Sequence, residues 1–504
     1  MPKEVPVPNL VINAGPGSGK TTTIIDIFSY LRATNTIAWH KQHPRVTEEQ
    51  RNVLDWCRNS LPEECRESCL YMAYNNTIKE ELEKKIHPKA EARTSHGAGY
   101  SILNKKFGYL KINEKRGQHI VERVTGQLLK DMVNKDKFQW LSTIRHLEKM
   151  KDELLDPTEE NFAKVHEKYS DLLAFGLHPE MVFQTQQVMP LMKTPTRDLG
   201  IEYVDQVWLA LFCLPKPIYK LGLVDECQDL SAARLALALR LCENLVFVGD
   251  PNQAINAFAG ADSRAFDKIR LVCDQELPLK LSFRCPPNRC RSINSIKPGA
   301  GVRPLPEKED GPETRETLEE YVELLKIIPE EERQNHLIVC RYNAPLVKIC
   351  LRLMRNKIPA YILGETLVKS LISMVKNRNA ADIQELRDKL KSYGNMLTRN
   401  SPEYVADIIT DKINCIFAVL PECKYVEDVE TELKKMLVPK KHVPFITLST
   451  IHRAKGLEAK HVAILFPPVE HPKASTQEQI EQEKNLHFVA ESRTSHSLTW
   501  VVQE

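Results

Sequence analysis

Two short segments of the chain carry residue types that could bind and hydrolyse a nucleotide. Residues 14–21 read AGPGSGKT, and residues 225–229 read DECQD. In the first, glycines let backbone N–H groups point inward around an anion, and the following lysine and threonine suit phosphate and Mg²⁺. In the second, adjacent carboxylates can hold the metal ion and polarise the attacking water. The combination predicts hydrolysis of ATP or GTP.

The roles within this nucleotide site follow from residue type. Lys20 is expected to reach the β- and γ-phosphates, while Thr21 and Asp225 hold Mg²⁺. Glu226 is expected to activate water, although an isolated acidic pair would more often be a solvated turn. The other cradle residues expected to contact the nucleotide are Ala14, which replaces the first glycine of the template, and Gly15, Pro16, Gly17, Ser18, Gly19 and Thr22.

Both segments follow short apolar runs, as loops at the ends of buried strands do. The runs that we interpret as strands are residues 10–13, 70–74, 221–224 and 245–248, and then 336–340, 444–448, 461–465 and 498–502. Helical stretches lie between them, among them an amphipathic stretch over residues 138–155. This alternation predicts an α/β fold with parallel sheets flanked by helices, and a site at the carboxyl ends of the strands.

Further short blocks accompany the two segments. They read AYNNTIKEEL at 73–82, TSHG at 94–97, GDPNQAINAFAGAD at 249–262, LSFR at 281–284, CRYN at 340–343, STIHRAKGLE at 449–458 and HFVAESRTSHSL at 487–498. In this order the blocks resemble those of the UvrD/Rep-like superfamily 1A DNA helicases. Their residues are similar to those of the compact phage and viral type. With the cradle, the resemblance extends over residues 11–498.

The resemblance implies ATP and Mg²⁺ as cofactors and assigns further nucleotide contacts. Gln253 would sense the γ-phosphate, and Arg284 and Arg493 would stabilise the charge that develops on it. Outside these blocks, each arginine would be interpreted as part of a surface salt bridge. Phe283 would stack on adenine, and Glu458 would bind the ribose.

The resemblance also implies single-stranded DNA and duplex junctions as partners. Tyr74 and Phe258 would stack on bases, a contact that tolerates any sequence. The candidate backbone contacts are Asn76, Thr94, His96, Arg341, Asn343, Thr450 and His452. Stacking and backbone contacts bind RNA as well as DNA, so RNA is an alternative to DNA as the nucleic acid along which the protein moves.

The implied architecture is two RecA-like P-loop NTPase cores with mainly helical insertions. We expect the first core over residues 1–100 and 218–280, a helical insertion over 101–217, the second core over 281–376 and 442–504, and a short helical insertion over 377–441. The second insertion is much shorter than the regulatory domain at this place in larger relatives. We therefore expect the motor core to be intact and its regulation to differ from that of the larger relatives.

Two other departures from the family pattern bear on function. Few residues precede the cradle, so we expect no upstream glutamine segment that reads adenine; Gln50, in the similar segment 47–56, is the alternative. Ala259 stands where the family has an arginine that contacts DNA, which predicts a weaker grip on the strand.

Composition sets broader bounds. A chain of 504 residues has room for two cores plus insertions. No apolar run approaches the about 18 residues of a membrane span, and the N-terminus MPKEVPVP lacks a secretory core. We expect no membrane partner and an intracellular protein, in the cytoplasm or, for a eukaryotic host or virus, the nucleus. The 13 cysteines form no C-x-x-C pair and are expected as reduced thiols.

The sequence therefore predicts an ATP-dependent DNA helicase that moves 3′ to 5′ on single strands, in replication, repair or recombination and with partner proteins of those processes. Polarity is implied by the resemblance alone. One alternative is a single-strand translocase that strips proteins from DNA with little unwinding. Another is a nucleotide-gated DNA-binding recombination factor without catalysis, which the intact set of catalytic residues disfavours. The net charge of +3 does not by itself indicate nucleic-acid binding.

Overall fold

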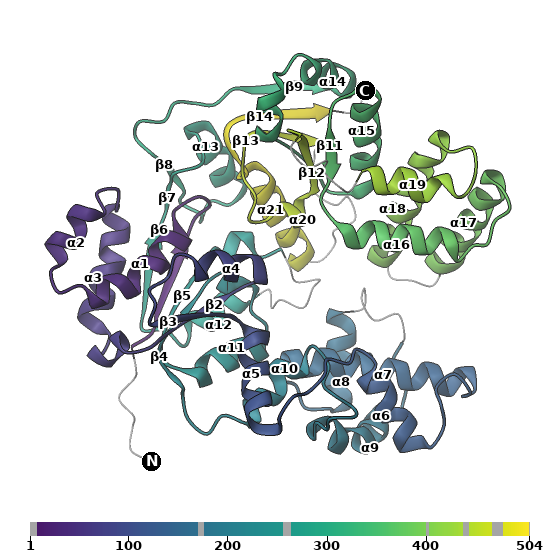
Figure 1. Ribbon diagram of the computed structural model, residues 1–504, viewed down its shortest axis with the longest axis horizontal. Helices are drawn as coiled ribbons and strands as arrows, with labels where there is room; N and C mark the ends of the chain where they lie inside the picture. Colours follow the sequence, from purple (N-terminus) through teal and green to yellow (C-terminus); the bar gives the residue numbers. More distant parts are fainter. Residues whose placement is uncertain are drawn as a thin grey trace. The chain divides into compact units, whose positions relative to one another are not determined.

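The computed structural model describes residues 8–169, 176–255, 264–399, 403–436, 443–465 and 477–502. The chain groups into two compact units, Met1–Lys280 and Leu281–Glu504, here called unit 1 and unit 2 (Figure 1). Each unit contains a six-stranded sheet in which every pair of neighbouring strands is parallel. Helices flank both sheets. The expected α/β fold is confirmed.

The sheet of unit 1 has the strand order β3-β2-β4-β5-β1-β6. Its strands are β1 (Leu10–Ala14), β2 (Cys69–Ala73), β3 (Ala90–Thr94), β4 (Tyr219–Val224), β5 (Cys242–Gly249) and β6 (Gln275–Leu279). Since all strands are parallel, their carboxyl ends share one edge of the sheet. The loops that contain AGPGSGKT and DECQD both leave from this edge.

Helices cover both faces of this sheet. They are α1 (Lys20–Arg32), α2 (Thr36–Gln42), α3 (Glu48–Ser60), α4 (Asn76–Glu83), α5 (Ser95–Phe107), α11 (Ala232–Leu241) and α12 (Ala265–Arg270). Successive side chains of a strand point to opposite faces, so Leu10 and Ile12 join the apolar cluster of α1 and α3, whereas Val11 joins that of α5 and α11. Burial on both faces explains why β1 is apolar at every one of these positions.

A helical region of unit 1 lies between α5 and β4, with its own apolar core around Trp140, Leu147 and Phe162 (Figure 1). Its helices are α6 (Arg116–Thr125), α7 (Asn134–Glu153), α8 (Glu159–Lys168), α9 (Met181–Lys193) and α10 (Asp205–Trp208). The predicted amphipathic stretch corresponds to most of α7.

Four buried charges tie these helices together. Arg116 Nη1 lies 2.6 Å from Asp205 Oδ2, and Lys151 Nζ lies 2.9 Å from Asp205 Oδ1 and 3.1 Å from Glu202 Oε2. All four side chains are at most 5% exposed. Because a buried charge is costly without its partner, this network fixes α6 and α7 against α10.

The sheet of unit 2 has the strand order β11-β12-β10-β13-β14-β9. Its strands are β9 (Glu313–Thr317), β10 (His336–Cys340), β11 (Ala360–Ile362), β12 (Ile446–Thr450), β13 (Ala459–Leu465) and β14 (Thr494–Val502). A separate two-stranded ladder joins β7 (Leu281–Ser282) to β8 (Arg303–Pro304).

The helices of unit 2 are α13 (Pro287–Ile296), α14 (Leu318–Lys326), α15 (Asn343–Arg355), α16 (Glu365–Lys376), α17 (Ile383–Thr398), α18 (Glu403–Val419), α19 (Asp428–Lys435), α20 (Ile451–Ala454) and α21 (Gln477–Glu491). Of these, α16 to α19 form a helical group whose apolar side chains belong to the same cluster as those of the sheet. One apolar cluster runs from Ile338 and Leu448 in the sheet to Leu371, Leu390 and Ile416 in α16–α18. The helical group starts at α16, upstream of residue 377; the boundaries of the two insertions stay a prediction.

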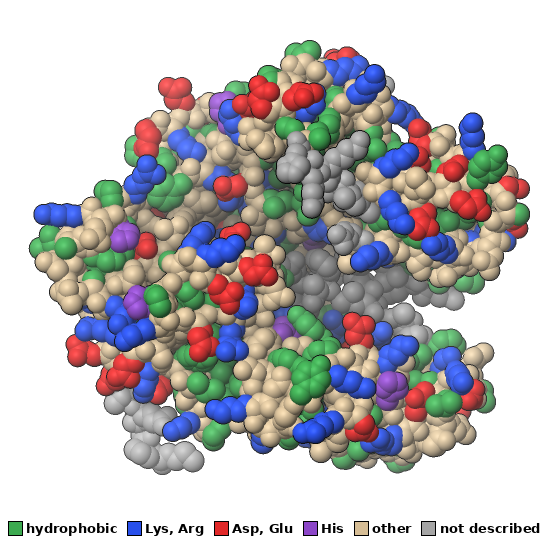
Figure 2. Space-filling view, viewed as in Figure 1, with side chains coloured by type: hydrophobic (Ala, Val, Ile, Leu, Met, Phe, Trp, Pro, Cys, Tyr) green, Lys and Arg blue, Asp and Glu red, His purple; other side chains and the backbone are tan. Residues whose placement is uncertain are grey.

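All 13 cysteines are free thiols, as expected. No helix in the described parts of the chain combines the length and apolarity that a membrane crossing requires. Lysine and arginine side chains are interspersed with acidic ones over the face seen in Figure 2, in keeping with the small net charge.

Candidate active site

The loop between β1 and α1 has the geometry of a phosphate cradle. Gly17 and Gly19 have φ angles of 65° and 79°, in the left-handed region that glycine adopts without strain. Ser18 Oγ donates to the Gly15 carbonyl at 2.9 Å, and the Gly15 N–H donates to the Leu279 carbonyl at 2.7 Å. The loop is thereby closed directly before the N-terminus of α1, where unpaired N–H groups favour an anion.

The two predicted metal-binding side chains meet at the carboxyl edge of the sheet. Thr21 Oγ1 donates to Asp225 Oδ2 at 3.4 Å, although 204 positions separate them. Burial raises the pKa of the Asp225 carboxyl to about 6, and the charge of Glu226 adds to the shift. A buried carboxylate beside a hydroxyl fits Mg²⁺, which takes one or two protein ligands and completes its shell with phosphate and water. Among the described residues no cluster of three or more His, Cys, Asp or Glu could hold a metal ion.

Glu226 is held in a constrained position next to Lys20. Its φ of 49° is uncommon for a residue with a side chain. Its Oε1 lies 3.8 Å from Lys20 Nζ, and Gln228 Nε2 donates to its Oε2. The predicted base and the predicted phosphate-binding lysine are therefore neighbours, which suits a carboxylate that must act beside the γ-phosphate.

A chain of hydrogen bonds connects Glu226 to Gln253. Gln228 Oε1 accepts from the Asp250 N–H at 3.0 Å, and Gln253 Nε2 donates to Asp250 Oδ2 at 2.7 Å. A Cβ on Gly249 would lie 2.3 Å from Gln228 Oε1, so only glycine permits this approach. Gln228 and Asp250 received no predicted role, although both lie inside recognised blocks.

Several predicted nucleic-acid contacts follow β2 and β3 at the same edge. Tyr74 comes directly after β2 and is 38% exposed. Asn76 is exposed at the first residue of α4, whereas its neighbour Asn75 caps that helix by accepting from the Ile78 N–H. Thr94 caps α5, with its Oγ1 accepting from the Gly97 N–H at 3.1 Å.

His96 contributes to a small pocket that adjoins the nucleotide site. It stacks on Tyr203, with ring centroids 3.9 Å apart and an interplanar angle of 22°. Burial lowers the pKa of His96 to about 3, and the Arg234 charge adds to this, so the ring is neutral at physiological pH. The pocket is lined by Met72, Ala73, Tyr74, Ser95, His96, Val224, Asp225, Leu230 and Arg234. Sequence reasoning missed Tyr203 and Arg234, which belong to no recognised contact motif.

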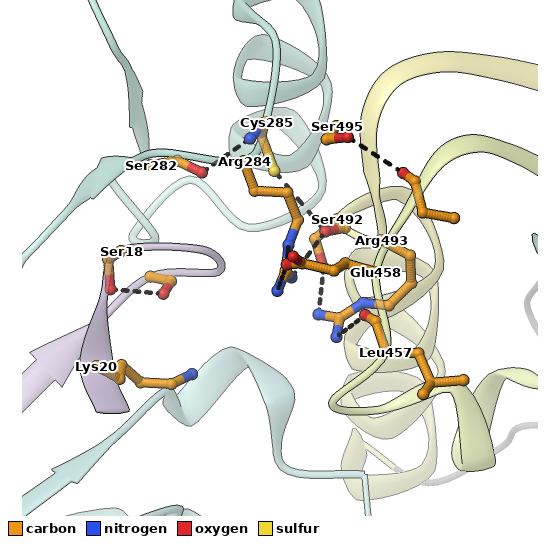
Figure 3. A network of polar contacts seen from close by, with 12 residues as sticks. Ser18, Lys20, Ser282, Arg284, Cys285, Leu457, Glu458, Ser492, Arg493 and Ser495 are labelled. Carbon is orange, nitrogen blue, oxygen red and sulfur yellow. Dashed lines mark hydrogen bonds and ion pairs between the residues drawn. The ribbon is translucent and has the colours of Figure 1, made fainter. Parts of the chain in front are cut away.

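In unit 2, a predicted arginine finger and the predicted ribose ligand bind each other. Arg284 Nε and Nη2 lie 2.7 and 2.6 Å from Glu458 Oε2 (Figure 3). Arg284 Nη1 also donates to the Ser492 carbonyl at 3.3 Å. Phe283, the predicted adenine platform, is 37% exposed. Any nucleotide contact by Arg284 or Glu458 would compete with this ion pair.

Arg493 is 1% exposed and donates to groups within unit 2 (Figure 3). Its Nε reaches the Val489 carbonyl at 2.9 Å, its Nη1 the Leu457 carbonyl at 3.2 Å, and its Nη2 the Ser492 hydroxyl at 2.8 Å. The bonds of Nη1 and Nη2 would have to be replaced if these two groups turned to a phosphate. A finger role for Arg493 stays a prediction.

The predicted nucleic-acid contacts at the end of β10 are bound by carboxylates. Arg341 forms a two-pronged pair with Glu483, at 2.9 and 3.2 Å. Asp411 of α18 accepts from Asn343 Nδ2 at 2.8 Å and from the Ala344 N–H at 2.9 Å, and so caps α15. Glu483 and Asp411 lie outside the sequence blocks, so these contacts were not predicted from the sequence.

The remaining predicted residues lie as follows. Thr450 is buried at the start of α20, and burial lowers the pKa of His452, in that helix, to about 3. Phe258 lies outside the described residues. Gln50 donates from Nε2 to Thr23 Oγ1 at 2.9 Å and accepts from the Thr47 N–H at its Oε1, so both ends of its amide are used within unit 1.

Comparison with known proteins places the nucleotide site in a family. A family model described as "AAA domain" matches residues 2–259, which include the phosphate cradle, the Asp225–Glu226 pair and Gln253. The chain belongs to this family. The AAA domain is a P-loop domain, in agreement with the cradle at Gly15–Lys20.

A curated protein is similar over most of the chain. It is the F-box DNA helicase protein 1 of Schizosaccharomyces pombe (strain 972 / ATCC 24843), with 21% identity over an aligned length of 490; the alignment covers 86% of this chain and 52% of the relative. The chain thus spans about half the length of this relative. The match extends beyond the AAA domain, since it is longer than the 2–259 segment.

Proposed function

We propose that this protein is an ATP-dependent DNA helicase of the UvrD/Rep type that translocates 3′ to 5′ on single strands. The observation that carries the proposal is the double use of Asp225. Its Oδ2 accepts from Thr21 of the phosphate cradle, and the same residue lines the pocket that contains Tyr74 and His96. A nucleotide site and an aromatic pocket therefore adjoin at one carboxylate. The name of the similar protein, a DNA helicase, supports the choice of track.

Hydrolysis in this proposal uses groups of unit 1. The N–H groups of the cradle and Lys20 bind the phosphates, and Thr21 and Asp225 would hold Mg²⁺. When bound, the ion neutralises charge on the phosphate oxygens. Glu226 accepts a proton from the water that attacks the γ-phosphorus, and ADP leaves with the bridging oxygen. Gln228 keeps Glu226 aimed for this transfer.

The bonds from Glu226 through Gln228 and Asp250 to Gln253 give hydrolysis a route to other parts of unit 1. We propose that loss of the γ-phosphate rearranges these hydrogen bonds. Through Asp225, the rearrangement changes how tightly the aromatic pocket binds the single-stranded DNA. Arg284, Arg493, Phe283 and Glu458 keep the nucleotide contacts that the resemblance implies. So do Arg341, Asn343, Thr450, His452 and Phe258 for nucleic acid.

The test is ATP hydrolysis by the full chain with and without single-stranded DNA, beside Glu226→Gln. We expect strong stimulation that the substitution abolishes while nucleotide binding persists, because Gln cannot take the proton. Hydrolysis that is indifferent to DNA would contradict the proposal and leave a P-loop NTPase of another purpose. The same assay with single-stranded RNA in place of DNA shows which nucleic acid stimulates hydrolysis.

Two follow-up assays separate the helicase from the protein-stripping translocase. Duplexes with 3′ or 5′ tails report unwinding and its polarity, and only the 3′ tail should support it. Displacement of streptavidin from a biotinylated strand, without strand separation, would favour the translocase instead. The replacement of the family's arginine by Ala259 is the sequence feature that keeps this alternative.

A further inference from the structure

The pocket beside Asp225 contains an arginine that the proposed mechanism does not use. Arg234 lies on α11, whose first turn is capped by Ser231. It lines the pocket together with Tyr74 and His96, at the carboxyl ends of β2, β3 and β4. Ligands of parallel α/β sheets bind at this edge.

The charge of Arg234 shifts the pKa of two titratable side chains of the pocket and of one side chain outside it. Burial raises the pKa of Tyr74 and lowers that of His96, and in both cases the Arg234 charge lowers the value. Burial raises the pKa of Asp152 of α7, and the Ser231 hydroxyl and the Arg234 charge oppose this. Asp152 Oδ1 already accepts from Ser231 Oγ at 2.6 Å.

Arg234 also has unused hydrogen-bonding capacity. Within the described parts of the chain its Nε is buried and has no hydrogen-bond partner. A guanidinium offers five N–H donors, and a buried donor without an acceptor is costly. The Nε N–H is therefore a donor that an acceptor from outside the chain could satisfy.

The other walls of the pocket suit an anion. Ser95 and His96 form the first turn of α5, a helix of 13 residues whose N-terminus carries partial positive charge. His96 is neutral, so Arg234 supplies the full positive charge among the lining side chains. The one acid, Asp225, has both oxygens occupied by the Thr21 hydroxyl and the Glu226 N–H.

We propose that this pocket binds one backbone phosphate of single-stranded nucleic acid, with Arg234 as its charged ligand. The inference rests on the proposed function and deepens it. The interior of the pocket has room for a group about the size of one phosphate oxygen, and the partly exposed ring of Tyr74 at its wall can stack on the neighbouring base. The stack of Tyr203 on His96 fixes the orientation of the histidine ring at the wall of the pocket.

The test is the salt dependence of binding of a fluorescein-labelled oligothymidine to the full chain, measured by anisotropy at about 50–200 mM salt. Arg234→Gln should weaken binding roughly tenfold. It should also reduce the slope of log K against log salt by about 0.7, the contribution of one phosphate contact on a single strand. Arg123→Gln is the matched control, because it removes the same charge from an exposed pair with Asp198 and should leave the slope unchanged.

A slope of wild-type size for a folded Arg234→Gln variant would overturn the inference and leave the proposed function standing. A wild-type chain that binds no oligothymidine would overturn both. If the glutamine variant does not fold by circular dichroism, Arg234→Lys decides. The ammonium keeps the charge and loses the planar fork, so the slope should persist with weaker affinity; wild-type affinity would contradict a direct contact.

Discussion

Replacement of Gly249 by alanine should uncouple Glu226 from Gln253. Gly249 ends β5, and a Cβ there would lie 2.3 Å from Gln228 Oε1 and 2.7 Å from Cys227 Sγ. Gln228 must then move away from the Asp250 N–H, to which it is bonded at 3.0 Å. The same movement withdraws Gln228 Nε2 from Glu226.

The magnitude has two parts. Overpacking at a buried site costs about 1–3 kcal/mol, and a buried N–H left without its acceptor costs about 1–3 kcal/mol more. The sum, about 2–6 kcal/mol, corresponds to a fall in Tm of roughly 4–24 °C, because a domain of this size loses about 2–4 °C of Tm per kcal/mol. Misplacement of the base by a fraction of an ångström or more should lower kcat roughly 10- to 100-fold.

Gly222→Ala provides the matched control in the neighbouring strand β4. A Cβ there would lie 2.6 Å from Cys242 Sγ and 2.6 Å from Leu245 Cδ2, so it should destabilise unit 1 by overpacking without touching Gln228. The assay is thermal unfolding together with steady-state ATP hydrolysis below the transition. Equal kcat losses in the two variants, or a folded Gly249→Ala variant with wild-type kcat, would refute the reasoning.

Three further substitutions test other features. Asp225→Asn should abolish Mg²⁺-dependent hydrolysis yet raise Tm at pH 8, because burial raises the pKa of Asp225 from 3.8 to about 6. A carboxyl whose folded pKa is raised destabilises the fold when ionised, so the gain should be full above about pH 6, about 3 kcal/mol, and vanish below about pH 4; a Tm difference that does not change with pH would contradict this. Lys151→Met should lower the free energy of unfolding by about 3–5 kcal/mol, since it leaves Asp205 and Glu202 short of a buried counter-charge; an unchanged denaturant midpoint would show that the network is dispensable. Glu458→Gln should change stability by at most about 1 kcal/mol, because Glu458 is 63% exposed, and should raise the KM for ATP if it binds the ribose; a KM of wild-type size would remove that role.

The interior of both sheets could be predicted from the sequence, and the edges could not. The apolar runs correspond to β1, β2, β4 and β5 in unit 1 and to β10, β12, β13 and β14 in unit 2. Within the two six-stranded sheets, the strands without a predicted run are β3, β6, β9 and β11, and these four lie at the sheet edges. Edge strands carry polar residues and proline, such as Arg93 in β3 and Pro278 in β6, because one side of their backbone has no partner strand.

The candidate site shows a similar division. The cradle and the Asp225–Glu226 pair could be recognised because their chemistry is written in adjacent residues. The bond of Gln228 to the Asp250 N–H and the place of Arg234 beside Tyr74 and His96 depend on packing between separate segments, which no local pattern encodes. For the same reason, the ion pair between Glu483 and Arg341, which are 142 positions apart, could not be predicted from the sequence.

The capping of α15 by Asp411 limits how the protein can be shortened. Asp411 belongs to α18, and the surrounding helices α16–α19 contribute Leu371, Leu390 and Ile416 to the apolar cluster of the unit 2 sheet. A truncated version that replaces these helices by a short linker would leave the first N–H groups of α15 without an acceptor and would expose to water the apolar side of α15 that packs against α18. Engineers who wish to alter this region will therefore have to redesign its surface and keep its buried side.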